Sequence, residues 1–144
     1  MSESLIGASR IYLDANCIIY FVERTDGLQG RVAKAIQFAG ENDRNLVCGE
    51  VGVAECLYGA FKAKSRELEA AYHESFYDIG LLELCAVNGD SLNAAAKIGA
   101  EKGLKLVDAL HFVAAMEMEC DIFVTNDERF RSNHGVKVVQ LRDL

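Results

Sequence analysis

The chain has 144 residues, of which 51% are apolar and 26% are charged. This size and balance suit one folded domain, expected over residues 1–144, and exclude disordered, collagen-like and low-complexity chains. The formal net charge of −7 argues against a protein that holds nucleic acid through a large, uniform basic surface.

The sequence indicates a cytoplasmic protein without a membrane anchor. The longest uninterrupted apolar run, at residues 17–22, is far shorter than the roughly 20 residues that cross a membrane as a helix. Residues 1–4 lack the basic and apolar regions of a signal peptide. The five cysteines are an odd number and form no C-x-x-C pair, which argues against a disulfide scaffold or a structural zinc site.

Two kinds of segment alternate along the chain. Short runs rich in apolar and β-branched residues predict strands at residues 11–13, 46–48, 81–87, 122–125 and 136–141. Longer stretches with helical periodicity predict helices at residues 15–24, 28–40, 51–60, 62–77, 91–102 and 109–120. Because these helices are long enough to cross over between parallel strands, the alternation predicts an α/β fold with a parallel sheet covered on both faces.

Polar side chains follow two of the predicted strands. Asp14 and Asn16 come after the first strand, and Thr125, Asn126 and Asp127 end or follow the fourth. The carboxyl ends of parallel strands share one edge of the sheet, where functional groups gather. There Thr125 and Asn126 could position a water or a phosphate. Taken singly, each of these residues is better explained as a turn former or a helix cap.

Glu55 lies on a helical stripe that is otherwise small or apolar. Its neighbours three and four residues away are Val51, Gly52, Tyr58 and Gly59, which share its face of the helix. A carboxylate packed on such a stripe is costly unless a cation or hydrogen bonds compensate its charge. The alternative is that the glycines leave a shallow groove in which water reaches the carboxylate.

Asp108 is expected to open a helix, at the N-cap or the first helical position. The helix that follows, over residues 108–116, is apolar nearly all round. An aspartate at a helix start satisfies backbone amides and interacts favourably with the helix dipole, which explains the residue without any chemistry. His111 lies one turn further along, and we expect it to be packed or to support a neighbouring functional group.

Taken together, the four acidic residues point to a metal site. Carboxylates brought together repel one another and raise one another's pKa unless a hard divalent cation joins them. Mg²⁺ and Mn²⁺ prefer oxygen ligands, and in proteins they commonly bridge a few carboxylates to a phosphate. A bound metal also supplies the activated water and the positive charge that phosphodiester cleavage needs.

These motifs resemble those of PIN-domain ribonucleases, and more narrowly those of the VapC-type toxins of toxin–antitoxin pairs. The segments that carry the resemblance are residues 11–16 (IYLDAN) with the helix at 17–22, residues 53–60 (VAECLYGA), residues 106–115 (LVDALHFVAA) and residues 124–130 (VTNDERF). They follow the family's order and span nearly the whole chain. Singly each segment is weak evidence, but four in register are strong.

The resemblance implies a three-layer α/β/α sandwich around a central, mostly parallel five-stranded sheet, and cleavage of RNA that depends on Mg²⁺ or Mn²⁺. Asp14 and Asp108 are the surest metal ligands by position. The family's four acidic positions fall on Asp14, Glu55, Asp108 and Asp127. Asn16 and Thr125 match the family's supporting polar positions.

The resemblance also implies partners: an RNA substrate, a small antitoxin protein and a second copy of the chain in a homodimer. Helices that carry aromatic residues suit a groove for a partner helix, and the candidates are Tyr20, Phe21, Phe76 and Tyr77. The alternative is that these aromatic residues complete the core.

Two features depart from what an RNA-cleaving toxin would favour. Glu50 stands at a strand-to-helix turn where such toxins often carry a hydroxyl residue, and the net charge is unfavourable for RNA. Basic residues are clustered, however, and could form a local rim that guides a phosphate backbone. They lie at positions 62, 64 and 66, at 97, 102 and 105, and at four positions between 129 and 142. The alternative is that they are solvated helix faces.

Three other classes of protein are weaker matches. A haloacid-dehalogenase-type phosphatase is expected to carry a second acid two residues after Asp14, where this chain has Asn16. A receiver domain would carry acids directly before Asp14, where Tyr12 and Leu13 stand. A catalytically weak PIN-fold module that works by binding a protein has no physical reason to retain four clustered carboxylates.

Overall fold

The structure, a computed structural model, describes residues 5–132 and 135–144. Its strands are β1 (Arg10–Leu13), β2 (Asn45–Gly49), β3 (Glu83–Cys85), β4 (Ile122–Thr125) and β5 (Lys137–Gln140). Its helices are α1 (Ala15–Val22), α2 (Gln29–Glu41), α3 (Glu50–Lys62), α4 (Arg66–His73), α5 (Gly89–Lys102) and α6 (Leu106–Glu117), with a π-helical turn η2 (Glu74–Asp78) and a 3₁₀ turn η3 (Leu141–Asp143). The segment on which the signal-peptide expectation depends, residues 1–4, lies outside the described residues, as do residues 133–134 of the basic C-terminal stretch.

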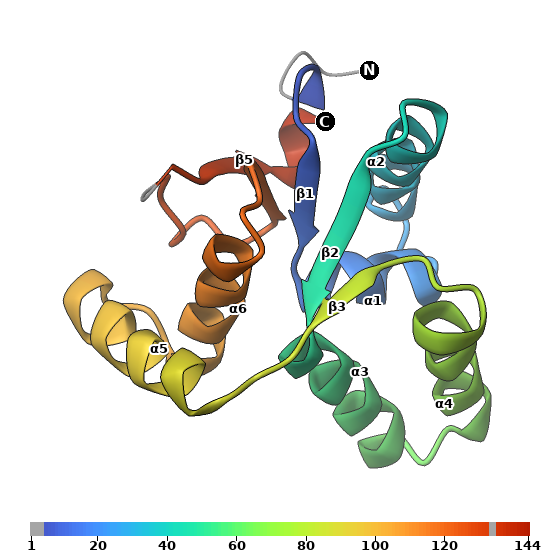
Figure 1. The fold of residues 1–144 in the computed structure, drawn as a ribbon. Helices are drawn as coiled ribbons and strands as arrows, with labels where there is room; N and C mark the ends of the chain where they lie inside the picture. The colour runs from blue at the N-terminus through green and yellow to red at the C-terminus, as the bar shows by residue number, and fades with distance from the viewer. Residues whose placement is uncertain (1–4, 133–134) are drawn as a thin grey trace.

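The five strands form one sheet with the order β3-β2-β1-β4-β5 (Figure 1). Each of the four strand pairs is parallel, so the expected sheet is confirmed and is parallel throughout. The chain builds β1, β2 and β3 in one direction and then returns to the other side of β1 to add β4 and β5. The carboxyl ends of β1 and β4 therefore flank the point where the strand order reverses, which is where open α/β sheets bind ligands.

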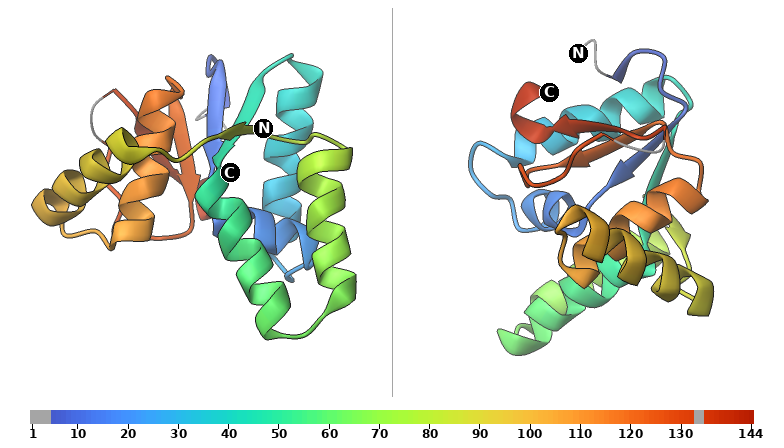
Figure 2. Two further views of the ribbon diagram at one scale, coloured as in Figure 1. Left: turned by 60° about the horizontal axis from the view of Figure 1, so that its bottom comes forward. Right: turned by 90° about the vertical axis from the view of Figure 1, so that its left-hand side faces the viewer.

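Helices cover both faces of the sheet, which confirms the three-layer α/β/α arrangement (Figures 1 and 2). Alternate residues of β1 point to opposite faces, as strand geometry requires. Ile11 and Leu13 join the core cluster beneath α1 to α4, whereas Tyr12 joins the cluster beneath α6. Helix α5 packs on the outside of α6, where Ala95 and Ile98 contact it.

The helix expected over residues 62–77 is present as α4 and η2, but it begins four residues later than expected, at Arg66. Helix α3 ends at Lys62, and Lys64 has a left-handed backbone with φ of 53°. Ser65 then caps the new helix α4 by accepting a hydrogen bond from the backbone N–H of Leu68 at 3.2 Å. A serine whose side chain bonds the backbone ahead of it favours a helix start over a helix interior, and helical periodicity alone does not place that boundary. As a result, α3 and α4 form a helical hairpin.

Two further sequence expectations concern the cysteines and the membrane. All five cysteines are buried and none is in a disulfide, as expected for thiols that act as small core residues. Across residues 5–132 and 135–144, the structure contains no helix with the length and apolar character needed to span a membrane.

Candidate functional site

Asp14 lies directly after β1, at the edge where the strand order reverses. Its side chain caps α1 by accepting a hydrogen bond from the backbone N–H of Cys17 at 3.0 Å, and it accepts a second from the hydroxyl of Thr125 at 2.5 Å. The residue is only 5% exposed. Burial raises the pKa of the Asp14 carboxyl, and the hydrogen bonds from Thr125 and Cys17 oppose that rise. The carboxylate is thus held in place at an electrostatic cost.

Thr125 links the ends of β1 and β4, which were expected to share one edge of the sheet. It is fully buried at the end of β4, next to β1 in the sheet. Its Oγ1 donates to Asp14 and accepts a hydrogen bond of 3.0 Å from the backbone N–H of Asp127. A single hydroxyl therefore couples the position of one acidic residue to the loop that carries another. Asn126, the remaining polar residue of this loop, points away and donates to the hydroxyl of Tyr20 at 3.3 Å.

Glu55 is held by a buried chain of hydrogen bonds. His111 Nε2 lies 2.5 Å from Glu55 Oε1, and His111 Nδ1 lies 2.6 Å from the hydroxyl of Tyr12. That hydroxyl accepts a hydrogen bond of 2.8 Å from the backbone N–H of Gly49. A neutral imidazole satisfies both neighbours if it accepts at Nδ1 and donates from Nε2. Burial raises the pKa of Tyr12 well above its ordinary value, so the phenol keeps its proton.

The surroundings of Glu55 combine features of both sequence-based alternatives. Its side chain is 38% exposed, and its neighbour Tyr58 is 68% exposed, so water reaches this stripe of α3. His111, at the same time, supplies the hydrogen bond that a packed carboxylate requires. Gly52 makes this possible, because a Cβ at that position would lie 2.6 Å from Cys48 Sγ and 3.2 Å from His111 Cε1.

Asp108 does not open its helix. Helix α6 begins at Leu106, with Lys105 at the N-cap, so Asp108 is the third helical residue and the expectation that it stands at the N-cap or first position is wrong. The error arose because Leu106 and Val107, 53% and 39% exposed, carry no polar start signal. Burial raises the pKa of the Asp108 carboxyl, and Arg129 opposes that rise.

Arg129 bridges two of the acids. Its Nη2 lies 3.0 Å from Asp108 Oδ2 and 2.6 Å from Asp127 Oδ2. Its Nε also donates to Asp127 Oδ1 at 3.0 Å. These hydrogen bonds lower the pKa of the Asp127 carboxyl. Sequence reasoning placed Arg129 only in a basic stretch. The sequence feature that could have identified Arg129 is its position two residues after Asp127, from which its side chain can reach the Asp127 carboxylate.

The four predicted acids line one small hollow together with Asn16. The lining is completed by Ala15, His111 and Phe130, and the space amounts to about 20 Å³, room for about one water-sized species. The structure thus brings Asp14, Glu55, Asp108 and Asp127 to one place from β1, α3, α6 and the loop after β4. Asn126 does not line it.

The four carboxylates that line the hollow are of the chemical type that binds a hard divalent cation. Within the described ranges, no three acidic, histidine or cysteine side chains are close enough together to hold an ion. Arg129 instead supplies positive charge to Asp108 and Asp127, and the carboxylate oxygens are the ligands that Mg²⁺ and Mn²⁺ prefer. The guanidinium thus supplies the charge that a cation would bring to this pair.

Comparisons with known proteins agree with this geometry. A family model of the PIN domain matches residues 11–135. No curated protein sequence matches the chain.

Solved structures with the same fold include chains of VapBC complexes and of a toxin–antitoxin complex. They include a chain of VapBC2 from Rickettsia felis bound to a DNA fragment from the promoter (TM-score 0.68, 17% identity, covering 91% of this chain and 98% of that one). A chain of DNA-bound VapBC from Salmonella typhimurium has a TM-score of 0.67 and 19% identity, and the match covers 92% of this chain and 98% of that one. A chain of a toxin–antitoxin complex from Klebsiella pneumoniae has a TM-score of 0.62 and 17% identity, with coverage of 88% and 94%.

The buried charge of Asp14 gives a prediction about stability and pH. Folding raises the pKa of Asp14. At a pH between its ordinary and its raised pKa, the folded state therefore binds more protons than the unfolded chain. As pH rises from the ordinary to the raised pKa, the contribution of Asp14 to the free energy of unfolding falls. Asn retains the N-cap and carries no charge. In EDTA, we expect Asp14→Asn to unfold at a higher urea concentration than the wild type at neutral pH, with the difference shrinking below the ordinary pKa of about 3.9. A difference that does not change with pH would contradict this account.

The buried hydroxyl of Tyr12 gives a second prediction. Tyr12→Phe removes the partner of two buried groups, His111 Nδ1 and the amide of Gly49, while the ring keeps its packing. Leaving buried polar groups without partners costs about 1–3 kcal/mol, which urea denaturation would measure. Tyr72→Phe is the matched control because its hydroxyl bonds the partly exposed Glu23. An equal loss in both variants would assign the cost to tyrosine hydroxyls in general.

Proposed function

Because the chain belongs to the PIN-domain family, whose members are typically nucleases, we propose that it is a metal-dependent endoribonuclease that cleaves RNA phosphodiester bonds. One observation carries the proposal: four carboxylates from four separate elements line a single hollow at the carboxyl ends of β1 and β4. A fold with no charge-dependent chemistry would gain stability by replacing such residues. RNA is the substrate that the sequence resemblance favours.

Asp14 and Asp108 would be the principal ligands of Mg²⁺ or Mn²⁺, with Glu55 and Asp127 completing the pocket directly or through water. When bound, a divalent cation supplies positive charge against the phosphate and lowers the pKa of a water. Each oxygen of Asp14 accepts one hydrogen bond and has a second lone pair to offer, so the network fixes the carboxylate without blocking it.

The remaining residues position the acids. His111 fixes Glu55 through Nε2, and Thr125 fixes both Asp14 and the loop of Asp127. Asn16 is exposed at the rim of the hollow, where its amide would contact a phosphate or a water. Arg129 must release Asp108 or Asp127 before a cation can share them, and the released guanidinium is then available to a phosphate.

We further propose that the protein is the toxin of a toxin–antitoxin pair. Support comes from the fold likeness to chains of VapBC and toxin–antitoxin complexes and from apolar side chains on the surface of α3 and η2. Tyr58, Phe61 and Tyr77 are 68%, 56% and 57% exposed, which suits a partner helix. Phe76 instead completes the core, and Tyr20 and Phe21 pack partly against it. The five unpaired cysteines support a cytoplasmic setting.

Cleavage of RNA tests the catalytic proposal. Purified protein should cleave single-stranded RNA with Mg²⁺ or Mn²⁺, and EDTA should abolish the reaction. Asp108→Asn keeps the side-chain volume but weakens metal binding. We expect its cleavage rate to fall by about two orders of magnitude or more, at least the loss caused by removing outer partners of metal ligands, while its melting temperature in EDTA is level or higher.

Glu50→Gln is the control for that variant, because Glu50, like Asp108, lies in the first turn of its helix but does not line the hollow. It should cleave like the wild type. Wild-type cleavage by Asp108→Asn at limiting Mn²⁺ would remove Asp108 from the site, and the same result for Asp14→Asn would refute the nuclease. An inactive wild type would favour a PIN-fold module that works by binding a protein, with Arg129 closing the acidic hollow.

Self-association tests the partner proposal. The purified chain should be a dimer in light scattering at tens of micromolar, an order-of-magnitude concentration at which association is concentration-dependent. A monomer over the whole concentration range would refute the dimer.

Binding of an antitoxin tests the exposed aromatic pair. Replacing this pair, Tyr58→Ser with Phe61→Ser, should weaken binding of a co-expressed antitoxin encoded next to this chain more than it lowers thermal stability.

A further inference from the structure

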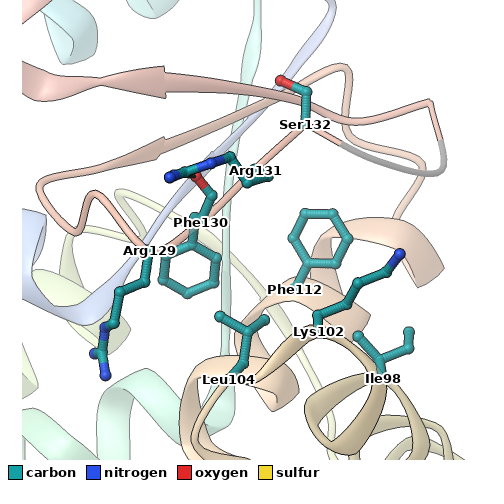
Figure 3. A pocket seen from close by; sticks show the side chains of 8 residues that line it. All are labelled: Ile98, Lys102, Leu104, Phe112, Arg129, Phe130, Arg131 and Ser132. Carbon is teal, nitrogen blue, oxygen red and sulfur yellow. Dashed lines mark hydrogen bonds between the residues drawn. The ribbon is translucent and has the colours of Figure 1, made fainter.

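We propose that a groove beside the acidic hollow binds an unpaired nucleotide of single-stranded RNA, next to the phosphate that is cleaved. This inference rests on the RNA substrate proposed above and assigns that substrate's binding surface. The groove has a volume of about 350 Å³, within the range of ligand sites. It lies between α5, Leu104 in the loop after α5, Phe112 of α6 and the segment after β4 (Figure 3).

The groove has an apolar floor and a basic rim. The floor is formed by Ile98, Leu104, Phe112 and Phe130. The rim carries Lys102, Arg129, Arg131 and Ser132. In Figure 3 the rings of the two phenylalanines lie between Arg129 on one side and Lys102 on the other. Arg129 is paired with Asp108 and Asp127, so Lys102 and Arg131, which pair with no carboxylate of the described residues, give a chain of net charge −7 its local positive charge at this groove.

This combination suits a nucleotide. A base would lie against the half-buried Leu104 and the small exposed parts of Phe112 and Phe130, which are 3% and 4% exposed, and the phosphates on either side offer negative charge to the rim. Arg131 is already ordered, since its Nη1 donates to the backbone carbonyls of Glu128 and Phe130. Ordering a guanidinium in advance lowers the entropy lost when it binds a phosphate.

The groove is continuous with the candidate active site. Phe130 lines both the groove and the acidic hollow, and Arg129 reaches from the rim of the groove to Asp108 and Asp127. A nucleotide seated on the floor would therefore direct the adjoining phosphate toward the acids. Base-paired nucleotides have both faces stacked and their edges occupied, so only an unpaired base can enter.

The rim favours RNA over a protein helix as the occupant. A helix that docks by its apolar face gains little from the cations Lys102 and Arg131, whereas each phosphate neutralised by Lys or Arg contributes affinity that depends on salt. A protein partner is thus the alternative outcome of the experiment below.

The test is RNA binding in EDTA, which does not require cleavage. A short, unstructured, fluorescein-labelled RNA is titrated with wild type and with the double variant Lys102→Glu, Arg131→Glu, and anisotropy is followed over a range of salt concentrations. We expect the double variant to lose affinity on the order of tenfold or more, and the slope of log affinity against log salt to fall by about 0.7 for each lost contact to a single strand. A duplex of the same sequence should bind more weakly to the wild type.

Lys97→Glu is the matched control, because it makes the same charge change on the exposed side of α5 without lining the groove. It should stay within about twofold of the wild type, as expected for a screened charge at a distance. Lys102→Gln with Arg131→Gln repeats the test without charge reversal in case the first variant folds poorly. Single iodouridine substitutions should photocrosslink to residues 98–112 or 129–132.

Unchanged affinity and salt slope in both double variants, or crosslinks only outside those residues, would refute RNA binding in the groove. The groove would then be a site for a protein partner. The two proposals can fail separately. RNA held in the groove by a protein that cleaves nothing with Mn²⁺ would refute the nuclease alone. Cleavage with an unchanged KM in the double variant would refute the groove alone.

Discussion

The structure depends on one electrostatic constraint, the placement of four carboxylates around one hollow at the edge where the strand order reverses. Burial raises the pKa of Asp14 and of Asp108, and the neighbouring charges of Asp127 and Glu55 add to the rise at Asp108. Hydrogen bonds from Thr125 and His111 and the charge of Arg129 offset the cost of these charges. The fold therefore holds these acids in place through hydrogen bonds and an ion pair from the polar groups around them.

Packing on both sides of the sheet sets the positions of those groups. His111 comes from α6 on one face and Glu55 from α3, whose apolar residues join the core of the other face. They meet because Gly52, which has no Cβ, lets α3 lie close to the His111 ring. The hydroxyl of Tyr12, from β1, forms a hydrogen bond with Nδ1 of the same ring. The hydrogen-bonded chain from Gly49 to Glu55 thus connects the two layers at the site.

The distribution of charge resolves the apparent conflict between an acidic protein and the RNA substrate proposed for it. The acids that line the hollow and the cations that rim the neighbouring groove lie side by side, and Arg129 belongs to both. A polyanion needs positive charge only along its path, since interactions between exposed charges are screened within about 10 Å at 0.1 M salt. Net charge by itself therefore says little about this function.

The sequence alone determined the α/β class, the parallel sheet and the four acids, because strand and helix periodicity and the residues that follow strands are local properties. It placed the start of α4 four residues too early and the start of α6 too late, because the local cap and start signals there are weak or overridden. The chain from Gly49 through Tyr12 and His111 to Glu55, the bridge by Arg129 and the groove join residues up to about 100 positions apart. Only tertiary packing brings such residues together, because no periodic signal in a single sequence encodes contacts between distant segments.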